Sequence, residues 1–326
     1  MDGWVKINME EKALSKIPVI GVVGPTASGK TKLAIELCKR YNGEVVSADS
    51  MQIYRYMSIG TARPTEQETE GIPHHMMGFA MPDETFSVAK YVAMAGEAIA
   101  DIHSRGKIAV VAGGTGLYID SLLNNIQFSE GKSDEQLRNE LSQIAAEQSP
   151  QVLWDMLNDI DPQTAQTLHP NNVWRVIRAI EVYRLTGKTM YQTQLESRTQ
   201  PSPYNACLIG INFRDRQKLY DRVNLRVDIM LEKGLIEEAK QLLRLGFTGT
   251  AHQAIGYKEL MPYIEGELPL EVCVDTLKQE SRRYAKRQLT WFRRNPKINW
   301  LYSDELQSKD EILEISSKVI DFSHII

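Results

Sequence analysis

The 326-residue sequence lacks the features that would assign it to a membrane, secreted or zinc-binding class. No run of about 18 apolar residues occurs, so we expect no membrane-spanning helix. The first 16 residues are charged and have no apolar core, which argues against a secretory signal. The three cysteines, Cys38, Cys207 and Cys273, are too far apart for a zinc motif or a disulfide framework. These absences favour a protein of the reducing cytoplasm.

A strong charge of either sign is also missing, since 38 basic residues against 42 acidic ones give a net charge of −4. That balance gives no support to a nucleic-acid partner, but the distribution of charge matters more than its sum. Between Lys278 and Lys297, 8 basic residues accompany a single acidic one, Glu280. The sequence therefore predicts a locally basic surface on an acidic protein.

The order of apolar runs and helical patterns indicates the fold. Strands are expected at residues 18–23, 44–48, 107–112 and 207–213, and helices at 32–40, 88–105, 215–245, 270–294 and 310–319. Strands that alternate with helices favour a parallel sheet covered on both faces. Residues 122–204 are polar, with apolar residues at helical spacing and no strand pattern. We therefore predict an α/β core formed by residues 1–121 and 205–326, interrupted by a helical insertion domain at 122–204.

A phosphate-binding loop follows the first predicted strand. It consists of Gly24, Pro25, Thr26, Ala27, Ser28, Gly29, Lys30 and Thr31, which fits the pattern G-x-x-x-x-G-K-[ST] between a strand and a helix. Backbone N–H groups of such a loop turn inward at the positive end of the helix and bind phosphate oxygens. Lys30 adds a positive charge, and the hydroxyl of Thr31 can ligate Mg²⁺. The expected fold is therefore a P-loop NTPase-like parallel sheet flanked by helices, and this loop alone would indicate a nucleotide kinase or an NTPase.

Asp49 follows the second predicted strand, at the edge of the sheet where ligands bind in open α/β folds. Its position leaves three roles open for the carboxylate: a metal ligand, a general base, or the cap of the next turn. Ser50, Met51 and Gln52 come next. The amide of Gln52 has the donor and acceptor pair that can recognise an adenine edge.

The third predicted strand ends in a glycine-rich turn, residues 113–116, at the same edge of the sheet. The glycines fit a tight connection from strand to helix, and Thr115 within it would expose a hydroxyl to the cleft. His74 and His75 are adjacent and would point to opposite faces of a strand, so we interpret them as structural rather than as metal ligands.

Eight segments, taken together and in order, resemble the tRNA dimethylallyltransferase family. They are GPTASGKT at 24–31, ADSMQIYRYMSIGTARPT at 48–65, IPHHM at 72–76, GGTGLYID at 113–120, HPNNVWRVIRAIEVYRLTGK at 169–188, YDRVNLRVDIMLEKGLIEE at 220–238, QAIGYKE at 253–259 and RYAKRQLTWFRRNP at 283–296. The match extends from about residue 18 to residue 302 and is far more specific than the phosphate-binding loop alone. Eukaryotic relatives carry a C-terminal zinc finger that has no counterpart in this sequence, which therefore resembles the bacterial type.

The resemblance implies a reaction and the roles of particular residues. The family transfers the dimethylallyl group of dimethylallyl diphosphate to N6 of the adenosine beside the anticodon of tRNA, with Mg²⁺. It implies that residues 24–31 hold the donor's diphosphate rather than ATP and that Asp49 is the general base. Thr26, Lys30 and Arg222 would act on the diphosphate. Arg226 lies one helical turn beyond Arg222 and could equally serve, so that choice stays open.

Contacts with the tRNA anticodon stem-loop are implied for several parts of the chain. The residues are Asp49, Ser50, Met51, Gln52 and Thr115, then Arg138, Arg175 and Arg178 in the insertion, and Arg283 and Arg287 near the C-terminus. The last two form an i,i+4 pair of like charges, which repel unless an anion such as phosphate offsets them. The alternative is a solvated helix face whose cations are paired with acids elsewhere. Because the target base must leave its stack to reach the cleft, we expect base flipping.

Three other functions remain open at the level of sequence. They are prenyl transfer to free AMP or ATP, as in related cytokinin-forming enzymes, a nucleotide or small-molecule kinase, and a non-catalytic RNA-binding module. The helical insertion and the basic segment favour tRNA, since a free nucleotide needs neither. We expect a monomer without membrane contact.

Overall fold

The computed structural model describes residues 16–128 and 134–326. The N-terminal segment, for which we predicted no secretory signal, lies outside these residues. The chain divides into two compact units, one made of the residues up to Leu123 together with Ser202–Ile326, the other of Asn124–Pro201. Across the described residues, no helix is both long enough and apolar enough to span a bilayer.

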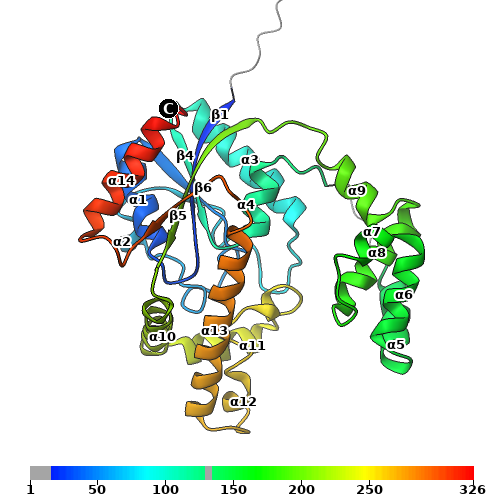
Figure 1. Ribbon diagram of the computed structural model, residues 1–326. Coiled ribbons are helices and arrows are strands. Elements are labelled where there is room, and N and C mark those ends of the chain that lie inside the picture. Colours follow the sequence, from blue (N-terminus) through cyan, green and yellow to red (C-terminus); the bar gives the residue numbers. More distant parts are fainter. Residues whose placement is uncertain (1–15, 129–133) are drawn as a thin grey trace, which may run out of the picture. The chain divides into compact units, whose positions relative to one another are not determined.

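A parallel sheet forms the centre of the first unit (Figure 1). Its strands are β1 (Ile17–Val23), β2 (Gly43–Ser47), β3 (His74–His75), β4 (Ile108–Gly113), β5 (Tyr204–Asn212) and β6 (Ile298–Tyr302). They lie in the order β3-β2-β4-β1-β5-β6, and every neighbouring pair is parallel. The predicted P-loop NTPase-like sheet is confirmed.

The alternation of side chains along β1 explains why both faces of the sheet are covered. Val19 and Val23 enter one apolar core together with residues of α3, whereas Ile20 and Val22 enter a second core with residues of α1 and α14. A strand buried on both faces reads as a continuous apolar run, as β1 does. The three cysteines are buried and free.

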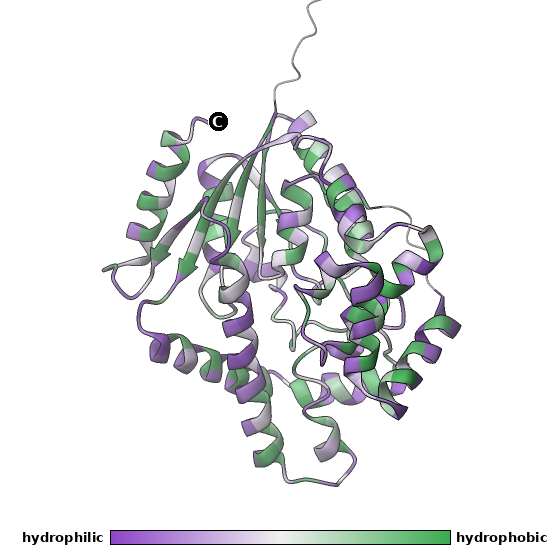
Figure 2. Cartoon of the chain, turned by 45° about the vertical axis from the view of Figure 1, so that its right-hand side comes forward, coloured by the Kyte–Doolittle hydropathy of each residue, from purple (hydrophilic) through white to green (hydrophobic). Residues whose placement is uncertain are grey.

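Helices surround this sheet in the first unit (Figures 1 and 2). They are α1 (Lys30–Arg40), α2 (Glu66–Thr69), α3 (Val88–Ser104), α4 (Gly116–Leu123), α10 (Arg216–Glu232), α11 (Leu235–Leu245), α12 (Met261–Ile264), α13 (Leu270–Phe292) and α14 (Lys309–Phe322), with a 3₁₀ turn at Ala251–Gln253. Figure 2 shows apolar and polar residues mixed on these helices, as expected where each helix buries one side.

Two details of the predicted element order were wrong. The single helix expected at 215–245 is divided into α10 and α11, because Gly234 adopts a left-handed conformation with φ 97° at the N-cap of α11. The strands β3 and β6 were missed. β3 has two residues and β6 has only one fully buried residue, so neither gives a long apolar run.

In its described residues the second unit contains helices and no strand. It contains α5 (Glu135–Glu147), α6 (Pro150–Ile160), α7 (Pro162–Ala165), α8 (Val173–Thr186) and α9 (Met190–Glu196). Its core is built from apolar residues of α5, α6 and α8, such as Leu141, Leu153 and Ile177. The hydroxyl of Ser202 donates to the carbonyl of Leu123 at 2.6 Å, so the first unit is joined to itself where the insertion leaves and returns.

A buried carboxylate ties three elements of the first unit together. Glu44 in β2 is 2% exposed and accepts hydrogen bonds from Arg105, which follows α3, and from Lys107 at 2.8 Å. Nε2 of His75 in β3 lies 2.8 Å from the other carboxylate oxygen. The hydrogen bonds from Arg105 in particular hold the pKa of Glu44 well below its usual value, against the opposing effect of burial, with smaller contributions from Lys107 and His75.

We predict that Glu44→Gln makes the protein less stable at neutral pH but less sensitive to acid. Because the pKa of Glu44 is lowered in the folded state, its stabilisation is present above the unfolded-state pKa and is lost as the pH falls below it. The expected loss at pH 7 is about 1–2 kcal/mol, since the cationic partners are partly solvated. Urea unfolding at about pH 7 and pH 3 measures this difference.

Glu70→Gln is the matched control, because the pair of Glu70 and Lys39 is exposed to solvent and should contribute little to stability. An equal loss of stability on acidification in the wild type and in Glu44→Gln would contradict the role given to this carboxylate.

Candidate active site

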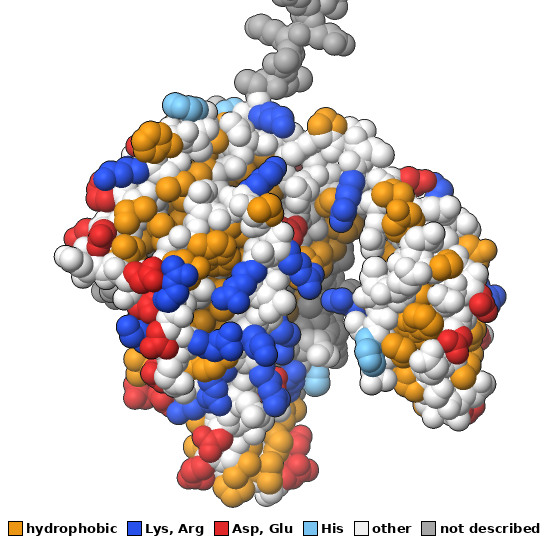
Figure 3. All heavy atoms as spheres, in the orientation of Figure 1, with side chains coloured by type: hydrophobic (Ala, Val, Ile, Leu, Met, Phe, Trp, Pro, Cys, Tyr) orange, Lys and Arg blue, Asp and Glu red, His pale blue; other side chains and the backbone are white. Residues whose placement is uncertain are grey.

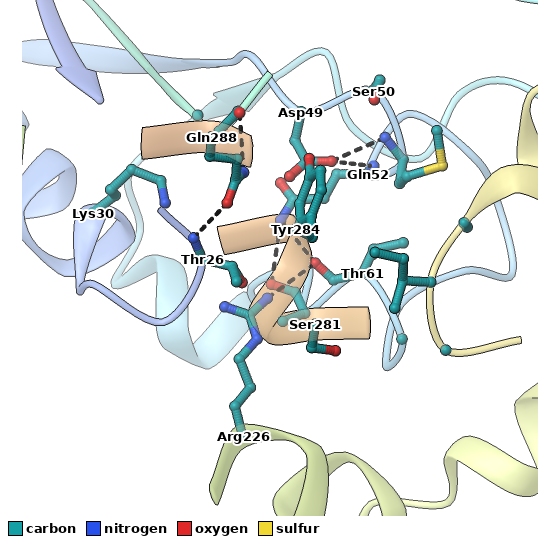
Figure 4. Close-up of a pocket in the computed structure, with 18 of the residues that line it drawn as sticks. Thr26, Lys30, Asp49, Ser50, Gln52, Thr61, Arg226, Ser281, Tyr284 and Gln288 are labelled. Atoms are coloured by element: carbon teal, nitrogen blue, oxygen red, sulfur yellow. Dashed lines mark hydrogen bonds between the residues drawn. The ribbon is translucent and has the colours of Figure 1, made fainter. Parts of the chain in front are cut away.

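A cavity of about 370 Å³ opens at the carboxyl ends of β1, β2 and β4 in the first unit (Figure 4). Its walls come from the phosphate-binding loop, residues 49–52, residues 60–62, the end of β4, α10, residues 253–258 and α13. Ligands of open α/β sheets bind at this edge. The structure therefore brings together segments that are up to about 260 residues apart, as the hydrogen bond between Thr26 and Gln288 illustrates.

The phosphate-binding loop has the backbone of an anion-binding nest. Gly24 has φ 141°, and a Cβ there would lie 2.3 Å from the carbonyl oxygen of Ile211, so only glycine fits. Ala27 adopts φ 62°, a conformation that non-glycine residues rarely take and that often marks functional loops. The hydroxyl of Ser28 is buried and has no hydrogen-bond partner among the described residues. A bound anion would satisfy such a loop.

Lys30 and Arg226 bring two positive charges to this cavity. Loss of hydration, with repulsion from Arg226 as the next cause, lowers the pKa of Lys30 to about 7, although Asp49 acts in the opposite direction. Loss of hydration also lowers the pKa of Arg226. Lys30 donates to the carbonyl of Pro25 at 2.6 Å and is not ion-paired among the residues that the structure describes. The site thus has a strong electrostatic preference for an anion.

Arg222 and Arg226, between which the sequence left the choice open, lie differently relative to the cavity. Arg226 lines the cavity, as Figure 4 shows, whereas Arg222 is exposed and is not among the described residues that line it. Nε of Arg222 donates to the carbonyl of Ala27 at 3.0 Å. Arg222 therefore supports the phosphate-binding loop from outside, and Arg226 presents its charge inside.

Asp49 lines the cavity, two residues after the end of β2 (Figure 4). One oxygen, Oδ1, accepts hydrogen bonds from the backbone N–H of Met51 at 2.9 Å and of Gln52 at 3.3 Å. Among the described residues no hydrogen bond ends on Oδ2. The carboxylate therefore caps the following turn with one oxygen and can take a proton on the other.

Gln52, for which we predicted a contact with an adenine edge, forms hydrogen bonds within the protein at both ends of its amide. Its side chain is 9% exposed, and its Oε1 accepts from the hydroxyl of Ser47 at 3.1 Å. Its Nε2 donates to the carbonyls of Thr61 at 3.2 Å and Ala62 at 3.3 Å. Gln52 therefore holds the cavity wall in place, and the predicted contact with a base stays a prediction.

The glycine-rich turn after β4 brings Thr115 beside the Asp49 segment. Oγ1 of Thr115 accepts from the backbone N–H of Ser50 at 3.0 Å and donates to its hydroxyl at 3.3 Å. Glycine is required here for close approach rather than for an unusual φ. A Cβ on Gly113 would lie 2.1 Å from the carbonyl oxygen of Ala48, and one on Gly116 would lie 2.2 Å from the ring of Trp291.

One face of α13 supplies site residues that the sequence analysis missed. Ser281, Tyr284 and Gln288 line the cavity and follow the i, i+3, i+7 spacing of a helix face, which is the signal that could have found them. Gln288 accepts from the backbone N–H of Thr26 at 2.8 Å and donates to the carbonyl of Gly114 at 3.0 Å. It therefore links the phosphate-binding loop to the turn after β4. Burial, and then the nearby charge of Asp49, raise the pKa of Tyr284.

The basic segment of α13 combines paired and unpaired cations. Lys278 pairs with Asp228 at 2.6 Å, and Arg283 pairs with Glu280 at 2.5 Å. Arg287 lines the cavity with its guanidinium 5.7 Å from the ring centre of Tyr284, and it has no ion pair among the described residues. Figure 3 shows Lys and Arg side chains gathered over the region of α10 and α13. The alternative of cations paired with acids thus applies to Lys278 and Arg283, and phosphate binding stays a prediction for Arg287.

Two of the three arginines predicted to contact tRNA from the helical unit share one internal carboxylate. Glu181 of α8 is fully buried and accepts from Arg138 at 2.8 Å and 3.0 Å, and also from Arg178. Burial favours a higher pKa for Glu181, but these hydrogen bonds leave it lowered. Arg138 and Arg178 therefore stabilise the unit, whereas Arg175 is exposed on α8.

His74 and His75 form contacts within the protein, and neither belongs to a group of metal-binding side chains in the described chain. His75 contacts Glu44, as described above, and Nδ1 of His74 lies 2.8 Å from the carbonyl of Ile72. The described part of the chain contains no group of three or more His, Cys, Asp or Glu side chains that could hold a metal ion. Thr31 lines the cavity at the start of α1, so a metal bound there would take most of its ligands from a substrate and from water.

Comparison with known proteins gives a consistent result. The family profile described as IPP transferase matches residues 52–295. A tRNA dimethylallyltransferase of Acetivibrio thermocellus is 52% identical over 298 residues, which covers 91% of this chain and 95% of that protein. A tRNA dimethylallyltransferase of Halalkalibacterium halodurans is 46% identical over 301 residues, which covers 92% of this chain and 96% of that protein.

Solved structures of similar proteins agree with the fold. The tRNA isopentenylpyrophosphate transferase of Bacillus halodurans has a TM-score of 0.70 and 44% identity, and the match covers 94% of this chain and 98% of that one. A eukaryotic dimethylallyltransferase acting on tRNA has a TM-score of 0.78 and 32% identity, with 94% of this chain and 80% of that one covered.

We predict that Arg226→Met and Arg222→Met have different effects on anion binding. Arg226→Met removes one of two repelling charges, so the ligand-free Tm should stay unchanged or rise, while the affinity for inorganic diphosphate should fall about tenfold or more. Arg222→Met leaves both cavity cations in place and should weaken binding less. The diphosphate-induced increase in Tm measures both effects. A larger loss of this increase in Arg222→Met would reverse the assignment.

Proposed function

The chain belongs to the IPP transferase family, and we propose that it transfers a dimethylallyl group from dimethylallyl diphosphate to N6 of the adenosine next to the anticodon of tRNA. The observation that carries this proposal is the pairing, within one cavity, of a cationic phosphate-binding loop with the carboxylate of Asp49. The loop suits a diphosphate leaving group, and the carboxylate suits an acceptor that must lose a proton. The relatives named above are tRNA dimethylallyltransferases.

The donor's diphosphate is proposed to lie in the nest formed by residues 24–31. Backbone N–H groups, Lys30 and Arg226 offer positive potential there. Negative charge develops on the diphosphate as its bond to the prenyl carbon breaks, and preorganised positive groups stabilise that charge. Arg222 and Gln288 hold the loop in the required shape through Ala27 and Thr26.

The acceptor amine is proposed to attack from the side of Asp49. An exocyclic amine is a weak nucleophile because its lone pair is delocalised into the ring. As N6 forms its bond to the prenyl carbon, the carbon–oxygen bond to diphosphate breaks, and Asp49 takes the proton that N6 loses. Ser50, Met51 and Thr115 line or border the space in which the flipped base would lie.

The family suggests a divalent metal, and we propose Mg²⁺ at the hydroxyl of Thr31. Mg²⁺ commonly takes one or two protein ligands together with substrate phosphates and water, which fits a cavity without a cluster of acidic or histidine ligands in the described chain. When bound, it supplies positive charge to the leaving diphosphate.

Recognition of the tRNA is proposed to involve both units. Arg287 at the cavity and Arg175 on α8 of the helical unit are exposed cations suited to phosphate. Arg283, one turn before Arg287 on α13, is exposed as well and would exchange its pair with Glu280 for a phosphate. Arg138 and Arg178 would contribute through the shape of that unit, since Glu181 binds their guanidinium groups. We also propose that the protein acts as a monomer in the cytoplasm.

A single assay separates this function from its alternatives. The protein is incubated with Mg²⁺ and dimethylallyl diphosphate labelled in its prenyl group, together with unmodified tRNA, AMP or no acceptor, and ATP hydrolysis is followed in parallel. We expect label in tRNA alone and one diphosphate released for each group transferred. Label only in AMP, or ATP hydrolysis without transfer, would refute the proposal.

Asp49→Asn tests the general base without removing the cap of the turn. The amide oxygen of Asn can still accept from Met51 and Gln52, but it cannot take the proton from N6. We expect the single-turnover rate of transfer to fall about 10²- to 10⁴-fold, with diphosphate affinity nearly unchanged. Asp49→Ala removes both roles and should also lower the Tm. A rate near that of the wild type in Asp49→Asn would exclude Asp49 as the base.

A further inference from the structure

A second carboxylate, Glu238 of α11, is bound by consecutive backbone N–H groups at the cavity wall. It accepts from Ser58 at 2.8 Å, from Ile59 at 2.9 and 3.0 Å, and from Gly60 at 2.9 Å. The hydroxyl of Tyr257 donates to the same carboxylate at 2.8 Å. Successive N–H groups that converge in this way form a nest for an anion, and here the protein supplies the anion itself.

The loop that Glu238 holds continues directly into the cavity. Gly60, Thr61 and Ala62 line it. The carbonyls of Thr61 and Ala62 accept from the amide of Gln52, and Arg226 lies 3.5 Å from the carbonyl of Thr61. Gln52 in turn donates its backbone N–H to Asp49. A short chain of hydrogen bonds therefore leads from Glu238 to Asp49, which would take the proton, and to Arg226, which would bind the diphosphate.

The conformation of this loop depends on external support. Ala62 adopts φ 47°, which costs free energy for a residue other than glycine and persists only where the surroundings enforce it. A Cβ on Gly60 would lie 2.6 Å from the ring and hydroxyl of Tyr257 and 3.0 Å from Leu235, so α11 and Tyr257 pack directly against the loop. Glu238 is the charged residue of α11 at this contact.

We propose that Glu238 is a positioning residue for the transfer reaction, which fixes the loop 58–62 and through it Gln52 and Arg226. This inference rests on the proposed function. Glu238 does not contact the substrates itself. It fixes the positions of groups at the cavity that would contact them. Misplacement of such groups by about 1 Å can lower the rate about 100-fold.

The test compares Glu238→Gln with Glu237→Gln, its neighbour on the same helix. Glu237 is exposed and pairs only with Lys240 in the described chain, so its variant should transfer at the wild-type rate. An amide at position 238 keeps the size of the side chain but turns a donor group toward backbone N–H donors. We expect single-turnover transfer at saturating substrates to fall about 10- to 100-fold, measured per active site so that unfolded protein does not contribute.

A double-mutant cycle with Gln52→Ala separates positioning from a general loss of stability. If Glu238 acts through Gln52, the combined variant should lose clearly less than the product of the two single losses, because the same link is broken twice. Losses that multiply fully, or a wild-type rate in Glu238→Gln, would overturn the inference. If Glu238→Gln does not fold, Glu238→Asp, which keeps the charge but shortens the side chain, is tested by the same criteria.

The transfer assay gives different results if the role of Glu238 is wrong and if the proposed function is wrong. Transfer to tRNA by the wild type and by Glu237→Gln establishes the function, whatever Glu238→Gln does. Absence of transfer in all three proteins refutes the proposed function instead.

Discussion

The burial of two cationic side chains, Lys30 and Arg226, at one cavity is the constraint on which the arrangement of the site depends. Both charges lose hydration in one cavity, and loss of hydration lowers the pKa of each. A protein keeps such a pair only if the surrounding structure holds it in place, because isolated side chains would turn toward water. The ligand-free site therefore contains electrostatic free energy that an anion releases on binding. The preference is for an anion in general, so a loop pattern shared with nucleotide-binding proteins does not by itself select ATP.

The support for this pair comes from side-chain amides and carboxylates that bind backbone groups of distant loops. Gln288 of α13 joins Thr26 to Gly114, and Glu238 of α11 binds the loop that begins at Ser58. Each of these side chains lies on a helix packed into the core of the first unit, so the rigidity of the core is transmitted to loops at the edge of the sheet. Loops alone would not hold the geometry that catalysis requires.

The sequence predicted the site residues that belong to a local pattern. It did not predict those whose place in the cavity depends on how a helix packs. Short sequence patterns indicate a strand, the loop after it and the order of strands in the sheet. They therefore sufficed to predict the loop from Gly24 to Thr31 and the position of Asp49 after β2. Whether Arg222 or Arg226 enters the cavity depends on the rotation of α10, which one turn of sequence does not specify. The roles of Gln52 and Glu238 were hidden because their partners are backbone groups, and every residue except proline offers the same ones. The basic residues of α13 drew attention to charge alone, so the uncharged Tyr284 and Gln288, which line the cavity together with Arg287, were missed.

The hydrogen bond between Ser202 and Leu123 has a consequence for how this chain could have arisen. Since it closes the first unit at the point where the second begins, the register of β5 against β1 is fixed by residues of the first unit alone. The helical unit is in this sense a removable module, with its own core and its own buried ion pairs. A gene encoding the α/β core could acquire, exchange or shorten such a module without rebuilding the sheet. Variation among relatives should therefore be tolerated more readily in the length of this module than in the spacing of the strands.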